Sequence, residues 1–200
     1  GATIGGVSTA STVAGLTIAS DLTGVGEVIS FTGTNGVDTF TGHANTDDTF
    51  VGGLGADHLN YTGRKSTFTG GAGADTFDID ALTNSTYALN FLTITDAEDG
   101  DIIDFDGIHN GTATWTSTEI ELGSGATLLN YLDNAVTTGG NTNTSAHWFR
   151  YGGDTYITFD NGNGTTWTDG TDFMIKLTGS KDISGLTADL SANTLTIDVA

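Results

Sequence analysis

The sequence holds 200 residues with 25 acidic against five basic side chains, so its formal net charge at pH 7 is −20. It contains no cysteine, which excludes a disulfide framework and thiol catalysis. So acidic a surface repels nucleic acid and anionic membranes, and no stretch is apolar and long enough to span a bilayer. We therefore expect no nucleic-acid partner and no membrane span, and we expect bound cations to offset the repulsion.

Residues 1–32 are rich in glycine, serine, threonine and valine. Stepping back in nines from Phe40 reaches the apolar residues Phe31, Leu22 and Val13. This period predicts parallel β-solenoid rungs without metal-binding turns in the first 32 residues. The opening residues lack a basic region and an apolar run, so we expect no amino-terminal signal peptide.

Five units of nine or ten residues follow between positions 33 and 78. Two of them, 52–60 and 70–78, match the pattern Gly-Gly-x-Gly-x-Asp-x-U-x, where U is a large apolar residue. This nonapeptide is an already described signature of calcium-binding parallel β-helices. Glycine permits positive φ angles in the turn, and carboxylate and carbonyl oxygens are the ligands that Ca²⁺ prefers.

The eighth residue of each unit is expected to point inward and fill the core. These residues are Phe40, Phe50, Leu59, Phe68 and Phe77. One turn of the coil takes two units, so we expect the loops at 33–38, 52–57 and 70–75 to stack along one edge. The predicted metal ligands of this edge are Gly33, Asn35, Gly36, Asp38, Gly52, Gly53, Leu54, Gly55, Asp57, Gly70, Gly71, Ala72, Gly73 and Asp75.

The loops at 42–48 and 61–66 are expected to share the other edge. The first carries Asp47 and Asp48 with a single glycine, and the second carries Arg64 and Lys65 where ligands are expected. We predict about two calcium ions on the first edge and little binding on the second. Asp48 is kept as a predicted ligand, and a cationic side chain could take the place of an ion there.

Beyond position 78 the nine-residue period ends. Residues 87–95 alternate like a strand, and the strongly acidic segment 96–106 follows. Such a segment is most often a solvated turn, but it directly follows the repeats. Asp99, Asp101 and Asp104 are therefore candidates for a terminal calcium site, and Asp101 is kept as a predicted ligand.

The remaining residues, 79–200, predict a β-rich cap with one short helix. Residues 126–136 carry apolar side chains on one helical face, and this helix is expected to pack on the open end of the solenoid. Residues 147–151 and 154–160 flank Gly152-Gly153 and predict a hairpin. The segment from Asp160 begins like an EF-hand loop, but the twelfth position is Thr171, so we reject that interpretation. The stretches 172–178 and 194–199 are expected to be strands.

The repeats at 33–78 resemble the RTX, or hemolysin-type calcium-binding, repeats of Gram-negative proteins exported by type I secretion. Residues 96–105 look like the segment that closes such blocks in secreted proteases and lipases. Residues 147–186, with WFRYGGDTYITFD and DFMIKLTGSKDISG, are similar to the carboxy-terminal segment of RTX-bearing surface and S-layer proteins.

The resemblance implies an all-β fold, a parallel β-roll or β-solenoid whose nonapeptide repeats bind Ca²⁺. It implies a non-enzymatic structural module of a secreted, self-assembling surface protein that folds on calcium outside a Gram-negative cell. The expected partners are calcium ions, neighbouring subunits in a lattice, the type I secretion machinery through a carboxy-terminal signal, and cell-surface polysaccharide.

Two other functions stay open at this stage. The chain could be the RTX tail of an extracellular enzyme such as a protease, lipase or epimerase, although H-E-x-x-H and G-x-S-x-G are absent from it. It could also be a calcium-rigidified adhesin module, with Trp115, Trp148 and Trp167 lining a glycan site, although aromatics so spaced are more often core.

Overall fold

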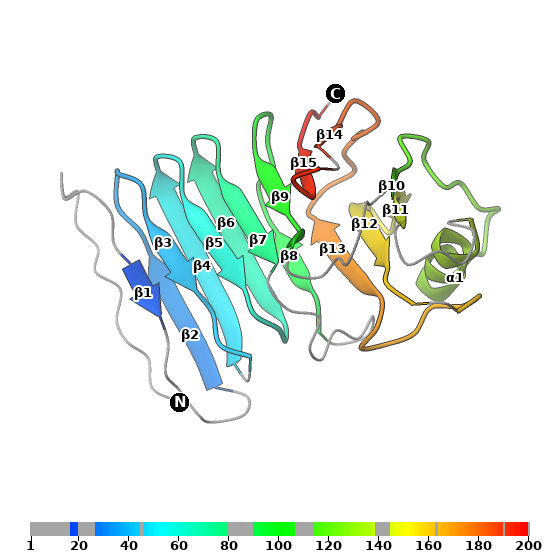
Figure 1. Ribbon diagram of the computed structural model, residues 1–200, viewed down its shortest axis with the longest axis horizontal. Helices are drawn as coiled ribbons and strands as arrows, with labels where there is room; N and C mark the ends of the chain where they lie inside the picture. The colour runs from blue at the N-terminus through cyan, green and yellow to red at the C-terminus, as the bar shows by residue number, and fades with distance from the viewer. Residues whose placement is uncertain are drawn as a thin grey trace.

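The computed structural model describes residues 17–19, 27–44, 46–79, 90–106, 114–138, 145–162, 164–189 and 191–199. Within these ranges the chain forms mostly β-strands in two mixed sheets, together with a single α-helix (Figure 1). The prediction of an all-β protein with one short helix is confirmed at this level. The predicted core residues Val13 and Leu22 lie outside the described residues.

One sheet contains seven described strands in the order β1-β3-β5-β7-β9-β15-β14. These are β1 (Thr17–Ala19), β3 (Thr39–Thr41), β5 (His58–Tyr61), β7 (Thr76–Ile79), β9 (Ile102–Asp104), β15 (Thr194–Thr196) and β14 (Thr187–Asp189). The other contains eight described strands in the order β10-β11-β12-β13-β8-β6-β4-β2. These are β10 (Thr114–Trp115), β11 (Ser145–Tyr151), β12 (Asp154–Asp160), β13 (Phe173–Leu177), β8 (Leu92–Ile94), β6 (Ser66–Ala72), β4 (Thr46–Leu54) and β2 (Glu27–Thr32).

Consecutive strands from β1 to β9 alternate between the two sheets, and within each sheet they pair in parallel. The register places Phe50 beside Phe68 and Leu59 beside Phe77, so residues 18 positions apart are neighbours. Strands β4 and β6 continue through glycines that were predicted to lie in turns, because Gly53 pairs with Gly71. The repeats therefore carry longer strands than the pattern predicts.

The space between the sheets is filled by the eighth residues of the repeats. Phe40, Phe50, Leu59, Phe68 and Phe77 are each at most 1% exposed. The rings of Phe50 and Phe68 stack with centroids 5.1 Å apart, and those of Phe40 and Phe50 with centroids 5.2 Å apart. These separations suit offset aromatic pairs, which contribute beyond their buried area. The predicted inward ladder is confirmed for all five residues.

The carboxy-terminal part continues the eight-stranded sheet. Strand β13 pairs in parallel with β8, and β12 and β11 follow as an antiparallel hairpin. Gly152 and Gly153 turn this hairpin with φ angles of 63° and 93°, which suit a type I′ turn. The predicted hairpin is confirmed.

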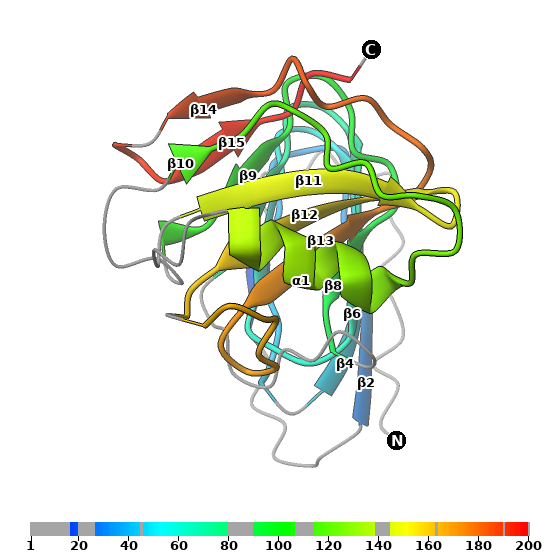
Figure 2. The same cartoon turned by 90° about the vertical axis from the view of Figure 1, so that its right-hand side faces the viewer.

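The helix α1 (Leu128–Thr138) covers the outer face of β11 and β12, as Figure 2 shows. Its buried residue Leu132 joins Phe149 and Met174 in one apolar cluster, while Trp148 points to the opposite face and the main core. The expectation that the helix packs on the open end of the stack is therefore wrong. Pairing of β13 with β8 extends the sheet there with strands, whose outer apolar face the helix then buries. Among the described residues no helix has the length and apolarity needed to cross a membrane.

Truncating one aromatic ring of the ladder tests this packing. We expect Phe68→Ala to lower the free energy of unfolding by about 3–5 kcal/mol, because the lost ring leaves a cavity between sheets that cannot collapse. Urea unfolding followed by circular dichroism measures this change. The half-buried neighbour Thr67→Ala serves as control, with a change within about 0.5 kcal/mol. Equal effects of the two variants would contradict the assigned core.

Candidate metal centre

Four buried aspartates form a row along one edge of the molecule: Asp38, Asp57, Asp75 and Asp101. Each directly precedes a strand of the seven-stranded sheet, β3, β5, β7 or β9. Parallel pairing of these strands brings the four residues together. The N–H of Asp38 donates to Asp57 Oδ1 (2.7 Å), that of Asp57 to Asp75 Oδ1 (2.8 Å), and that of Asp75 to Asp101 Oδ1 (3.0 Å).

The hydrogen bonding of the second carboxylate oxygen, Oδ2, differs between the ends of the row and its middle. At the ends, Asp38 Oδ2 accepts from the Thr34 N–H, and Asp101 Oδ2 accepts from the Glu98 N–H (2.9 Å). In the middle, Asp57 Oδ2 and Asp75 Oδ2 are buried without a hydrogen-bond partner among the described residues. A buried carboxylate oxygen without a partner is costly, and a bound cation is one way to satisfy it.

The predicted glycines surround these two oxygens. A side chain at Gly52 would meet both Asp57 Oδ2 and the carbonyl oxygen of Gly70, so these two oxygens face the same point. Gly71, with φ of 102°, lies against the carbonyl oxygen of Gly53. The absence of side chains therefore lets carboxylate and carbonyl oxygens converge, as an oxygen-only site for a hard cation requires.

The remaining predicted ligands lie in the same three loops. Leu54 and Ala72 pair with each other at the ends of β4 and β6, so their carbonyl groups belong to adjacent loops. In the first loop Thr34 stands where the other two have Gly53 and Gly71, and its N–H and hydroxyl both bind Asp38 Oδ2. The first loop therefore satisfies its own aspartate with protein groups.

Burial and neighbouring negative charge act on the ionisation of the row. The pKa of Asp57 is raised to about 6, chiefly by burial. The hydrogen bond from the Asp38 N–H opposes this rise, and the charges of Asp75 and Asp38 add to it. Burial likewise raises the pKa of Asp101 to about 6 and raises that of Asp75. A divalent cation between the carboxylates would favour their ionised forms and reverse these shifts.

The opposite edge is built differently. Asp48 is buried, but its Oδ2 accepts from the His43 N–H (3.1 Å) and its Oδ1 from the Thr46 hydroxyl (2.6 Å). Asp47 pairs with Arg64 at 2.9 Å. The predicted loop 42–48 is shorter than expected, because β4 already begins at Thr46. Protein groups thus satisfy Asp48, and an arginine offsets the charge beside it.

The three candidates for a terminal site do not come together. Asp101 precedes β9 and joins the row, whereas Asp104 is the last residue of that strand. Asp99 Oδ1 accepts from the Val199 N–H at 2.8 Å. The prediction of one site from all three residues is wrong, because a strand separates Asp101 from Asp104.

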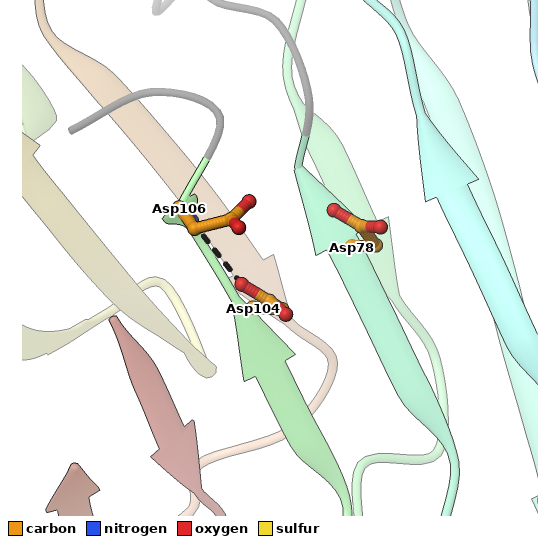
Figure 3. Close-up of side chains that lie close together, drawn as sticks. All are labelled: Asp78, Asp104 and Asp106. Carbon is orange, nitrogen blue, oxygen red and sulfur yellow. Dashed lines mark hydrogen bonds between the residues drawn. The ribbon is translucent and has the colours of Figure 1, made fainter. Parts of the chain in front are cut away.

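Asp104 belongs instead to an acidic cluster with Asp78 and Asp106, drawn in Figure 3. Their carboxylate oxygens lie within 4.8 Å of one another, and the Asp106 N–H donates to Asp104 Oδ1 at 3.2 Å. His58 Nε2 lies 2.9 Å from Asp78 Oδ2. This cluster could hold a metal ion. It escaped the sequence analysis because only the register of β7 with β9 places Asp78 beside Asp104.

No protein-family model matches the chain, and no curated protein matches it either. The site is a row of buried carboxylates and glycine carbonyls, with oxygen as its only donor element, at one edge of two sheets of stacked parallel strands.

Replacing Gly71 with alanine tests whether this position must lack a side chain for the loop oxygens to converge. We expect Gly71→Ala to lower stability by more than about 1 kcal/mol, because the position has a left-handed φ and lies against the Gly53 carbonyl. Thermal unfolding in calcium measures the loss. Gly123→Ala is the control, since nothing lies within 4 Å of a side chain there. A Gly71→Ala protein as stable as this control would contradict the loop geometry.

The raised pKa values predict a pH dependence of the metal-free protein. A group with a raised folded-state pKa stabilises the fold below its unfolded pKa, and this stability is lost as pH rises through the folded value. With Asp57 and Asp101 shifted from 3.8 to about 6, the melting temperature of metal-free protein should fall between about pH 4 and about pH 7. Calorimetry on wild type and Asp57→Asn measures this fall, which should be smaller in the variant. Identical profiles would exclude Asp57 as a source.

Proposed function

We propose that this chain is the calcium-folded structural module of a secreted bacterial surface protein of the RTX class. Its repeats form a β-roll, and its carboxy-terminal part closes the roll and carries the type I export signal. The module itself performs no catalysis. Calcium ions, neighbouring copies in a surface lattice, and the export machinery are its partners, with cell-surface polysaccharide as an anchor.

A single observation carries the proposal. Asp57 Oδ2 and Asp75 Oδ2 are buried without a hydrogen-bond partner from the described ranges, in the two repeats that match the nonapeptide at every defined position. Protein groups satisfy the corresponding oxygens of Asp38 and Asp101. Two orphaned oxygens between glycine carbonyls fit the expectation of about two calcium ions on this edge.

The topology supports the β-roll. Strands alternate between two sheets, pair in parallel, and place residues 18 positions apart side by side, as a coil of two nonapeptides per turn requires. A small apolar core between short strands gives such a coil limited stability of its own. A calcium site occupied at 100 times its dissociation constant adds about 2.7 kcal/mol, which is a large share of the stability of a typical domain.

The charge of the chain explains why folding would wait for export. The formal charge of −20 opposes compaction in a calcium-poor cytosol, where the chain would stay unfolded for transport. Outside the cell, abundant calcium would neutralise the row and condense the repeats. Folding after passage would also prevent return through the secretion channel.

The adhesin alternative has less support. Trp148 is 1% exposed and Trp167 is 8% exposed, and Trp115 packs against the main core. A sugar site needs an exposed aromatic platform. The three tryptophans serve instead in packing, so nothing in their placement favours glycan recognition.

Removing one carboxylate charge from the middle of the row tests the proposal. We expect Asp57→Asn to lose the calcium bound on both of its sides, and with it about 2.7 kcal/mol per site at 100-fold saturation. Titration calorimetry with Ca²⁺ gives the number of ions, and far-UV circular dichroism in chelator gives the dependence of the fold.

Asp47→Asn is the charge-matched control on the opposite edge and should titrate like the wild type. A wild-type spectrum indifferent to chelator, or an Asp57→Asn variant with undiminished calcium binding, would refute the calcium-folded module.

A further inference from the structure

Two aspartates outside the repeats face each other across neighbouring strands. Asp160 is the last residue of β12, and Asp172 immediately precedes β13. The antiparallel register pairs Phe159 with Phe173, so the next position places Asp160 opposite Asp172. Like charges directly opposite each other in a sheet are destabilising, so this pair needs an explanation.

Both carboxylates are buried and oriented by backbone groups of the connecting loop. Asp160 is 3% exposed and Asp172 is 1% exposed. The N–H groups of Asn161 and Thr168 donate to Asp172 Oδ1 (3.1 Å) and Oδ2 (2.6 Å), and that of Gly162 donates to Asp160 Oδ1 (3.0 Å). Of the four carboxylate oxygens of this pair, only Asp160 Oδ2 is buried without a hydrogen-bond donor in the described part of the chain.

No basic side chain in the described ranges acts on this pair. The pKa of Asp160 is raised to about 6, chiefly by burial and in part by the charge of Asp172, and burial also raises the pKa of Asp172. A hydrogen bond between the two side chains contributes to both shifts, which requires a proton on one of the two carboxyl groups. When both carboxyl groups are ionised, two desolvated negative charges face each other without compensation from the described residues.

We propose that Asp160 and Asp172 hold a calcium-sized divalent cation, at a site separate from the repeats. The loop offers only oxygen donors, which favours Ca²⁺ over metals that prefer nitrogen or sulfur. A Cβ at Gly162 would lie 3.3 Å from Asp172 Oδ1, so glycine lets the backbone approach this carboxylate closely. In an EF-hand loop that began at Asp160, the last ligand would stand at position 171, which is a threonine here. Asp172 is the next residue, and the loop ends there.

The ion would anchor the carboxy-terminal part of the fold. Trp167 lies within the same loop, its N–H donates to Asp133 Oδ1 of helix α1 at 2.9 Å, and its indole N–H donates to Asp169 Oδ1 at 2.9 Å. Trp167 also packs in the apolar cluster beneath the helix. A cation that holds the two ends of the loop together therefore fixes α1 on the outer face of the sheet.

The test compares Asp160→Asn with the exposed control Asp189→Asn, each in the full chain. Calcium per chain is counted by titration calorimetry, and Tb³⁺ is the luminescent probe, excited through tryptophan. Because Trp167 lies in the loop, a terbium ion bound there should emit strongly on tryptophan excitation. The proposal predicts one calcium ion fewer and loss of sensitised emission in Asp160→Asn, with both readouts unchanged in Asp189→Asn. It also predicts a higher melting temperature of metal-free Asp160→Asn, because the repulsion is gone.

An unchanged ion count and an unchanged calcium-induced rise in melting temperature in Asp160→Asn would overturn the proposal, leaving a shared proton as the role of the pair. Should that variant not fold, NMR of the wild type with Tb³⁺ decides. The amide resonances of Gly162 and Thr168 must then broaden, and their persistence would exclude the site. These readouts do not depend on Asp57. The experiment can therefore refute the proposed site at Asp160 and Asp172 without refuting the site in the repeats, and the reverse also holds.

Discussion

Burial of carboxylates along one edge is the constraint on which the repeat region depends. Asp57, Asp75 and Asp101 each use one oxygen to accept the backbone N–H of the aspartate before them in the row, which ties successive loops together. This arrangement brings negative charges close to one another in a desolvated position. A fold that stacks acids in this way holds its loops in register only where something offsets the charge.

The two edges of the stack offset their charge by different means. On the edge of Asp57 and Asp75, glycines take the place of larger residues, and two carboxylate oxygens have no hydrogen-bond partner in the part of the chain that the structure describes, which favours a cation. On the opposite edge, Asp48 is satisfied by a hydroxyl and a backbone N–H, and Arg64 pairs with Asp47. The two edges therefore differ in whether described protein groups satisfy both oxygens of the buried aspartates.

Acidic side chains are also brought together outside the row of Asp38, Asp57, Asp75 and Asp101. The acidic pair Asp160 and Asp172 lies where antiparallel strands place it, and the cluster of Asp78, Asp104 and Asp106 lies where parallel strands do. Strand pairing, which depends on apolar side chains, thus brings acids together on both halves of the molecule. The pairing of strands in the two sheets therefore decides which aspartates lie close to one another.

The sequence by itself determined the ladder of Phe40, Phe50 and Phe68 and the row of Asp38, Asp57 and Asp75. Units of nine or ten residues, two to a turn, place residues 18 or 19 positions apart at equivalent points of a regular coil. Only the tertiary structure decided that Asp101 continues the row, that Asp104 lies beside Asp78, and that Asp172 faces Asp160. The reason is physical. Asp101 follows Asp75 after 26 residues, and the pairing of β13 with β8 joins segments that share no period, so packing of apolar faces rather than local spacing set these contacts.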